Sequence, residues 1–167
     1  MRILFPLLLC LAAAAGDARR PLLTLTGPKS FVETAEAHRA RSAAEFEKLW
    51  LRHAGKTEND AFYNAAGVPD IDFDRCMVIA VFQGMGWNSA GLRVEALIEE
   101  EGRILLRFDD KSYQTEGPDG GGVRVTAYGF FVLPRSDKPV VVEEDVQDLI
   151  GAPPKWKERA RFAAISE

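Results

Sequence analysis

Residues 76–83 read Cys-Met-Val-Ile-Ala-Val-Phe-Gln, an apolar run that stops at a glycine-rich segment. A run this short, bounded by turn-forming residues, predicts a β-strand whose two faces are both covered by protein. A strand of that kind lies in the middle of a sheet. We therefore expect the fold to be built around this segment, with neighbouring elements covering both of its faces.

The sequence after this run predicts a β-hairpin. Apolar and polar side chains alternate from Leu92 to Ile98 and again from Ile104 to Phe108, and a short connection containing Gly102 joins the two segments. Alternation of this kind is typical of strands with one buried face. Weaker patterns predict strands over residues 22–26, 30–39, 123–133 and 139–142, and one helical turn over 145–150. The tail, 155–167, fits either a helix or an edge strand.

The segment from Ser42 to Ala54 predicts a helix. Ser42 and Glu45 have the spacing of a capping box, in which the hydroxyl and the carboxylate satisfy free backbone N–H groups. Phe46, Leu49, Trp50 and His53 then recur at helical spacing on one face. Gly55 follows and suits the left-handed conformation that ends many helices.

These elements indicate one α+β domain in a chain of 167 residues. Five to seven strands and one well-capped helix, without strand–helix alternation, predict a mainly antiparallel sheet that is curved or closes partly into a barrel. We expect a signal peptide over 1–16, a lead-in over 17–29, the domain over 30–150 and a C-terminal tail over 151–167, which packs on the domain or trails from it.

The first residues have the features of an export signal. Arg2 precedes an apolar run from Ile3 to Ala15, and small alanines end that run. The run is too short for a stable membrane span. Cleavage near Gly16 would place the mature protein in the periplasm or outside the cell. Alternatively, Cys10 could carry a lipid anchor, although the large Leu9 before it fits a lipoprotein signal poorly.

Charge and composition exclude some partner classes. The net charge is −4 and the sequence pI is about 5.3. A protein that coats nucleic acid would carry a basic surface, so no nucleic-acid partner is expected. After removal of the signal, Cys76 is the remaining cysteine, and no intramolecular disulfide can form.

No catalytic, cofactor or metal site emerges from the motifs. Asp70, Asp72 and Asp74 imitate the start of a calcium loop, but the sixth and twelfth positions hold Arg75 and Val81 instead of Gly and Glu. Residues 84–91 are glycine-rich, yet a strand is predicted after them, whereas a dinucleotide site needs a helix there. We expect an inter-strand connection in their place.

A thiol or serine hydrolase stays open as an alternative. Cys76 could act with His38 or His53, since an imidazole can activate a thiol, and Ser89 is a second candidate nucleophile. Against this, Cys76 begins an apolar run in which a cysteine behaves as a small buried hydrophobe. His53 lies on the apolar helix face, where packing and the helix dipole explain it.

Candidate binding residues are polar and aromatic side chains on predicted loops and strands. We expect partner contacts from Trp87, Asn88, Ser89, Tyr113 and Tyr128. An exposed edge strand could also pair with a partner. A third interpretation is a pocket for a small ligand inside the curved sheet, lined by Phe108, Tyr128 and Phe130.

The order of these motifs resembles the PrcB-like C-terminal domain family. The similarity covers residues 30–135 and rests on S-x-x-E-F-x-x-L-W-x-x-H at 42–53, V-P-x-I-D-F at 68–73, N-S-A-G at 88–91 and T-x-Y-x-F-F-x-L-P at 126–134. Family members often have Gly-Tyr after the glycine turn, where this chain has Gly91 and Leu92. The resemblance implies an accessory, non-catalytic role, in which the domain binds or stabilises an envelope protein or a protease complex.

Overall fold

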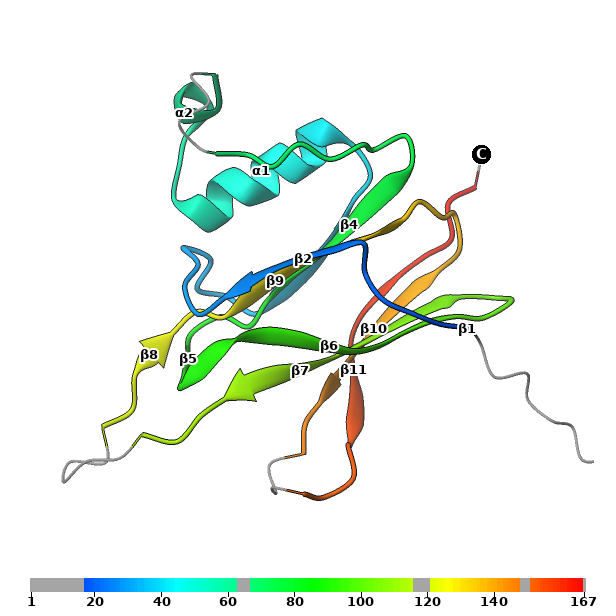
Figure 1. Ribbon diagram of the computed structural model, residues 1–167. Coiled ribbons are helices and arrows are strands. Elements are labelled where there is room, and N and C mark those ends of the chain that lie inside the picture. The colour runs from blue at the N-terminus through cyan, green and yellow to red at the C-terminus, as the bar shows by residue number, and fades with distance from the viewer. Residues whose placement is uncertain (1–16, 63–66, 116–120, 148–150, 167) are drawn as a thin grey trace, which may run out of the picture.

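The computed structural model describes residues 17–62, 67–115, 121–147 and 151–166. The expected signal peptide, including Cys10, lies outside these residues. A helix, a middle sheet and an outer sheet are stacked in three layers (Figure 1). The helices are α1 (Ala43–Ala54) and α2 (Glu58–Phe62). The strands are β1 (Asp17–Arg19), β2 (Leu23–Gly27), β3 (Glu36–Ala40), β4 (Cys76–Phe82), β5 (Gly86–Trp87), β6 (Ser89–Glu99), β7 (Ile104–Ser112), β8 (Arg124–Val125), β9 (Tyr128–Pro134), β10 (Val140–Asp145) and β11 (Trp156–Phe162).

The middle sheet has the strand order β2-β9-β4-β3, and all of its pairings are antiparallel. In β4, residues 77, 79 and 81 face the outer sheet, whereas residues 78, 80 and 82 face α1. All six side chains are fully buried. This confirms the predicted central strand and explains its uninterrupted apolar sequence, because successive side chains of a strand point to opposite faces.

The outer sheet has the order β1-β6-β7-β10-β11. The predicted hairpin is confirmed as β6 and β7, paired antiparallel. The tail forms the edge strand β11, so of its two predicted conformations the strand is correct. Strand β10 lies parallel to β7, the one parallel pairing among the described strands.

Helix α1 follows the prediction closely. Ser42 is the N-cap and its hydroxyl accepts the N–H of Glu45, while the Glu45 carboxylate accepts the N–H of Arg41. Gly55 ends the helix in the left-handed conformation, with φ of +62°. Phe46, Leu49 and His53 are buried as expected, and Leu51 is buried in addition.

Several sequence predictions need correction. The strand expected over 30–39 begins only at Glu36, and residues 28–35 form a loop. The strand expected over 123–133 is interrupted at residues 126–127, between β8 and β9. Asp145 belongs to β10, and its carboxylate accepts backbone N–H groups of Gln147 and Lys155, whereas a helical turn was expected there. Residues 148–150 of that expected turn lie outside the described part of the chain.

The fold is α+β with mainly antiparallel sheets, and the described strands close no barrel. The two large sheets nevertheless touch at both sides. On one side the Leu92 N–H of β6 donates to Thr26 Oγ1 of β2 at 2.6 Å. On the other, Arg39 of β3 donates to the Ala163 carbonyl oxygen and stacks over the Phe162 ring. The predicted curvature of a single sheet stays a prediction.

Candidate functional site

A cavity of about 510 Å³ opens at one end of the middle sheet. Its walls come from the loop after β2, the last turn of α1, the segment after β4 and strand β8. Figure 1 shows these segments gathered at the same end of the molecule. The lining includes Lys29, Phe31, Glu33, His53, Met85 and Arg124. A cavity of this size is typical of sites that enclose a small molecule or a partner's side chain.

The end of α1 holds Phe31 at the cavity. The Phe31 N–H donates to the carbonyl oxygen of His53 at 2.9 Å. The Phe31 ring lies against Gly55, where an added Cβ would come within 2.7 Å of a ring carbon. The helix-ending glycine therefore leaves the space that this ring occupies. Phe31 is nevertheless 75% exposed, because its other side faces solvent.

A close contact between two loops places Met85. Gly84 has φ of +75°, and a Cβ at this position would meet the backbone N of Ala35 at 2.7 Å. The Met85 N–H then donates to the carbonyl oxygen of Glu33 at 3.0 Å. Only glycine fits this approach without displacement of the facing backbone. The Met85 side chain projects outward and is 57% exposed.

Strands β5 and β8 place Trp87 beside the same cavity. Trp87 pairs with Arg124, whose guanidinium lies 5.1 Å from the centre of the indole ring. Asn88 follows in the left-handed region, with φ of +53°. Its side-chain oxygen accepts the N–H of Val123 at 2.7 Å, and its own backbone N–H donates to the Val123 carbonyl oxygen at 2.9 Å. Asn88 therefore ties the end of β5 to β8, and the glycine-rich segment leads into a strand, as predicted.

Two exposed apolar side chains, Phe31 and Met85, line the cavity, and two more lie beside its lining residue Arg124: Trp87, which contacts the guanidinium, and Val123, which precedes it in the chain. We call these four residues the apolar rim. Their exposed fractions are 75%, 57%, 57% and 46%. Large apolar side chains gathered on a surface, as opposed to scattered singly, are characteristic of interaction sites. Tyr113 is 41% exposed and joins this region through its N–H, which donates to the Asn88 carbonyl oxygen at 2.8 Å.

His53 forms part of the cavity floor and is 8% exposed. Aromatic rings surround it, and the nearest, that of Tyr128, has its centre 4.0 Å from the imidazole centre. The buried Nδ1 has no hydrogen-bond partner. Burial lowers the pKa of His53 to about 4. The imidazole is therefore neutral at pH 7, so the expected interaction of a protonated His53 with the helix dipole is wrong, whereas its predicted packing is confirmed.

Charged groups lie at the mouth of the cavity. Lys29 and Arg124 contribute cations and Glu33 contributes a carboxylate. Among the described residues none of these three side chains forms an ion pair. An apolar interior with a few charged groups at its entrance suits a ligand or side chain that combines an apolar body with a polar end.

The structure separates the five predicted partner-binding residues. Trp87 and Tyr113 are exposed, and Asn88 holds the loop between them. Tyr128 is half-buried against His53, and burial raises its pKa. Ser89 is only 1% exposed. Surface contact with a partner is therefore open to Trp87 and Tyr113 and closed to Ser89.

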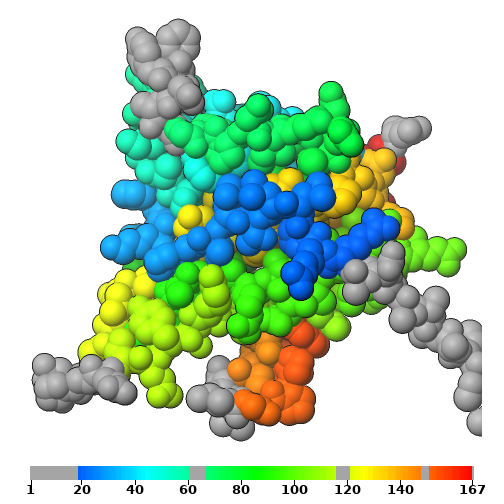
Figure 2. Space-filling view, in the orientation of Figure 1, coloured from blue at the N-terminus to red at the C-terminus, as the bar shows by residue number. Residues whose placement is uncertain are grey.

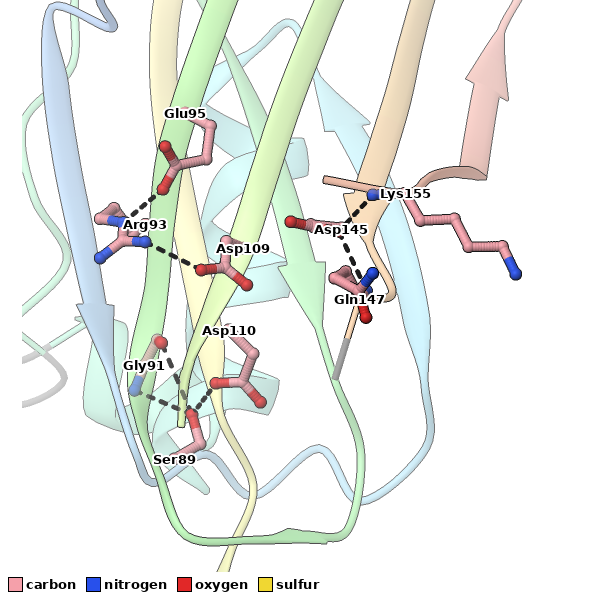
Figure 3. Close-up of polar contacts among 9 residues, drawn as sticks. All are labelled: Ser89, Gly91, Arg93, Glu95, Asp109, Asp110, Asp145, Gln147 and Lys155. Carbon is pink, nitrogen blue, oxygen red and sulfur yellow. Dashed lines mark hydrogen bonds and ion pairs between the residues drawn. The ribbon is translucent and has the colours of Figure 1, made fainter. Parts of the chain in front are cut away.

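Ser89 is bonded within the fold, as Figure 3 shows. Its hydroxyl donates to the Asp110 carboxylate of the neighbouring strand β7 and accepts the N–H of Gly91 at 3.0 Å. Burial raises the pKa of Asp110, and the hydrogen bond from Ser89 opposes that rise. These hydrogen bonds hold the first residue of β6 to β7. The Ser89 hydroxyl bonds neither histidine.

Cys76 is half-buried at the first position of β4, more accessible than the sequence indicated. His38 pairs with Ala80, four residues further along β4, which is roughly 13 Å at the rise of a strand. His53 packs against Phe82, six residues along and roughly 20 Å away by the same measure. Strand geometry therefore keeps both imidazoles away from the thiol.

The three aromatic residues expected to line one ligand pocket do not share a cavity. Phe108 is fully buried between the two sheets, whereas Phe130 is fully buried under α1 and Tyr128 packs beside it. The expectation placed them inside one curved sheet, and the separation into two sheets puts them in different clusters. The cavity with the apolar rim lies elsewhere.

Asp72 organises the turn that leads into β4. Its carboxylate accepts the N–H of Asp74 at 3.1 Å, and its carbonyl oxygen accepts the N–H of Cys76 at 2.9 Å. Within residues 17–62, 67–115, 121–147 and 151–166, no group of three or more histidine, cysteine or acidic side chains is placed to hold a metal ion.

Sequence reasoning missed most residues of the site: Lys29, Phe31, Glu33, Met85, Val123 and Arg124. Phe31 was assigned to a strand, although Gly27 and Pro28 just before it mark a turn and Lys29-Ser30 continue a polar segment. That turn signal could have identified the loop. No local pattern marks Met85 or Arg124, because only tertiary structure brings them together.

None of the helices in the described ranges has the length and apolar character needed to cross a bilayer. In comparisons with known proteins, no family model, no curated protein and no solved structure matches this chain.

Proposed function

We propose that this chain is an exported, non-catalytic domain that binds or stabilises a partner protein or complex in the bacterial cell envelope. The observation that carries the proposal is the apolar rim at a cavity of about 510 Å³. An exposed aromatic or apolar anchor beside a pocket is the arrangement found at the centre of protein interfaces. The apolar leader sequence at residues 1–16 supports export to the periplasm or the exterior.

The local geometry of the rim favours a preformed surface. Backbone hydrogen bonds hold the main chain of Phe31 to the end of α1 and that of Met85 to Glu33, and the Trp87 ring contacts the guanidinium of Arg124. A main chain held in place before binding loses little conformational freedom in the complex, which favours affinity. The resemblance to the PrcB-like family supports the same accessory role, with a protease complex as a candidate partner.

The enzyme and small-ligand alternatives each require a particular arrangement of residues. A thiol enzyme would need an imidazole near Cys76, and a serine enzyme would need a base for Ser89. The distances along β4 argue against the thiol enzyme, and the 1% exposure of Ser89 argues against the serine enzyme, because a substrate could not reach the hydroxyl. A small-ligand module is the second candidate, and the mainly apolar cavity that His53 lines favours it.

Site-specific photo-crosslinking in the native host tests the proposal. A photoreactive residue replaces Trp87 in one variant and Lys48, an exposed residue of α1, in the control. We expect a discrete adduct with an envelope protein at position 87 and none at 48. Crosslinks of equal yield at both positions, or none at position 87, would contradict the proposed surface.

Export is tested on the same material by N-terminal sequencing. The mature chain is expected to begin near Gly16 or Asp17 and to appear in the envelope fraction. A full-length chain confined to the cytoplasm would contradict export. Mass spectrometry of the N-terminal fragment separates this result from lipidation at Cys10.

A further inference from the structure

A second concave region lies between the two sheets, apart from the cavity with the apolar rim. It is a groove of about 810 Å³ bounded by β2 on one side and β6 on the other. In the space-filling view the blue residues of the N-terminal strands lie directly against the green residues of β6 (Figure 2). The strands meet where Gly91 approaches Thr26 and Gly27, and residues 19–21 cross at the opposite end.

The groove exposes a free backbone edge of β6. Strand β1 pairs with β6 only at Leu97–Glu99, so no described strand pairs with residues 93–96 on that side. The Leu92 N–H points across this edge to Thr26. Since alternate residues of a strand direct their N–H groups to the same side, the Val94 N–H faces the groove as well. An unpaired edge is a template for an added strand.

Charge in the groove is opposite to that of the whole protein. Its lining carries the cations Arg19, Arg20, Arg93 and Lys111 against the single carboxylate of Glu95, while the chain has a net charge of −4. Arg19 pairs with Glu99, and Arg93 pairs with Asp109 and Glu95. Arg20 and Lys111 form no ion pair or side-chain hydrogen bond with any described residue. These two cations are available to a ligand.

We propose that this groove binds an extended acidic segment of another protein, which adds a short strand to the free edge of β6 in line with β1. The free edge comprises residues 93–96, and because the pairing of β6 with β7 shifts register between Val94 and Ala96, the new backbone hydrogen bonds centre on Val94. Backbone hydrogen bonds to β6 supply the pairing, and Arg20 and Lys111 select acidic side chains. The groove shares no lining residue with the first cavity, so this inference does not rest on the proposed function.

The probe is the acetylated and amidated peptide Val-Glu-Val-Glu-Val-Glu, titrated into ¹⁵N-labelled protein comprising residues 17–167. Two further peptides serve as comparisons: one with Gln in place of Glu, and one acidic peptide whose alternate backbone nitrogens are methylated. Two new exposed ion pairs predict that the acidic peptide binds roughly three- to tenfold more tightly than the Gln peptide. Shifts and slower amide exchange should centre on Val94.

Substitutions test whether Arg20 and Lys111 select the acidic peptide. Arg20→Gln with Lys111→Gln should remove the preference for the acidic peptide, whereas Lys48→Gln with Lys157→Gln, exposed cations elsewhere, should leave it unchanged. Equal binding of the Gln peptide, or no binding of any peptide, overturns the proposal. Equal binding of the methylated peptide also overturns it, because the groove would then attract polyanions without strand pairing. Trp87→Ala should not alter peptide binding, which keeps this test distinct from that of the apolar rim.

Discussion

The backbone N–H of Leu92 donates to the hydroxyl of Thr26 at 2.6 Å, and this bond joins the edge strand of the middle sheet to the outer sheet. The same hydroxyl donates to the carbonyl oxygen of Tyr128 at 2.8 Å. Next to it, Gly91 has φ of +114° and allows the two backbones to touch. Thr26 therefore connects strands β2, β6 and β9 at one end of the groove between β2 and β6.

Thr26→Val is expected to destabilise the fold by about 1–2 kcal/mol, because the Leu92 N–H and the Tyr128 carbonyl oxygen both lose a partner while side-chain volume is kept. Urea unfolding at equilibrium measures the change. Thr26→Ser retains the hydroxyl and serves as the matched control. A valine variant as stable as the serine variant would show that the bond does not hold the sheets together.

His53 is expected to make stability depend on pH. Its pKa is about 4 in the folded protein and about 6.5 in the unfolded chain, so between these values only the unfolded chain takes up the proton. Proton uptake favours unfolding, and stability should fall as pH decreases from about 6.5 to 4. The full effect is on the order of 3 kcal/mol.

The measurement is urea unfolding across this range for the wild type and for His53→Leu, which keeps an apolar side chain of similar size. The variant should lose most of the slope that His53 contributes, because the remaining titratable groups are the same in both proteins. Parallel pH profiles for the two proteins, or an NMR titration of His53 with a midpoint above pH 6, would contradict the burial argument.

Asp110 is expected to change stability with pH in the opposite direction to His53, so that its contribution becomes more favourable as pH falls. Burial raises its pKa in the folded state, so folding is less favourable at neutral pH than it would be with an uncharged group. Asp110→Asn retains an oxygen that can accept from Ser89 and removes the charge. The variant should be more stable than the wild type at pH 7, and the difference should shrink as pH falls and Asp110 becomes protonated.

Ser89→Ala is the companion variant, since it removes the donor to Asp110 and leaves the carboxylate less well satisfied. It should be less stable than the wild type at pH 7 by about 1–3 kcal/mol. Its effect should be smaller in the Asp110→Asn background, where no charge needs the donor. Equal effects in both backgrounds would show that the Ser89 hydroxyl does not serve the Asp110 charge.

Cys76 is expected to behave as an unactivated thiol. The strand geometry places both histidines at least four residues away along β4, so neither imidazole lies within reach of the thiol. The alkylation rate of the native protein at pH 7 should not exceed that of the unfolded chain. Labelling roughly tenfold faster in the native state would revive the thiol-enzyme alternative.

The sequence predicted those helices and strands that depend on residues close together in the chain. The capping pair Ser42 and Glu45 and the terminal Gly55 define α1 without reference to any other part of the chain. The alternation in β7 likewise reports which face of the strand is buried, since Ile104, Leu106 and Phe108 lie in the core. In β6 the alternation predicted from Leu92 to Ile98 is wrong after Val94, because a register shift between Val94 and Ala96 places Leu97 in the core in place of Ala96 and Ile98. Strand β4 was recognisable because both of its faces are covered, which leaves no polar position.

Long-range pairing was not predictable in the same way. Nothing near Val140 indicates that β10 runs parallel to β7, because residues 36 positions apart pair there. The separation into two sheets depends on such pairings. The cavity escaped prediction for the same reason, since Phe31, Met85 and Arg124 come from three separate loops and strands. Trp87 was identified because an aromatic residue in a glycine-rich segment stands out by itself.

We expect this domain to bind its partner through the apolar rim. Hydrogen exchange of the purified domain, alone and with the envelope protein recovered by crosslinking, tests it most directly. Backbone amides at Phe31, Met85 and Trp87 should become protected, while those near Lys48, an exposed residue of α1 outside both the rim and the groove, should not change. Protection around Lys48, with the three rim residues unaffected, would contradict binding through the rim.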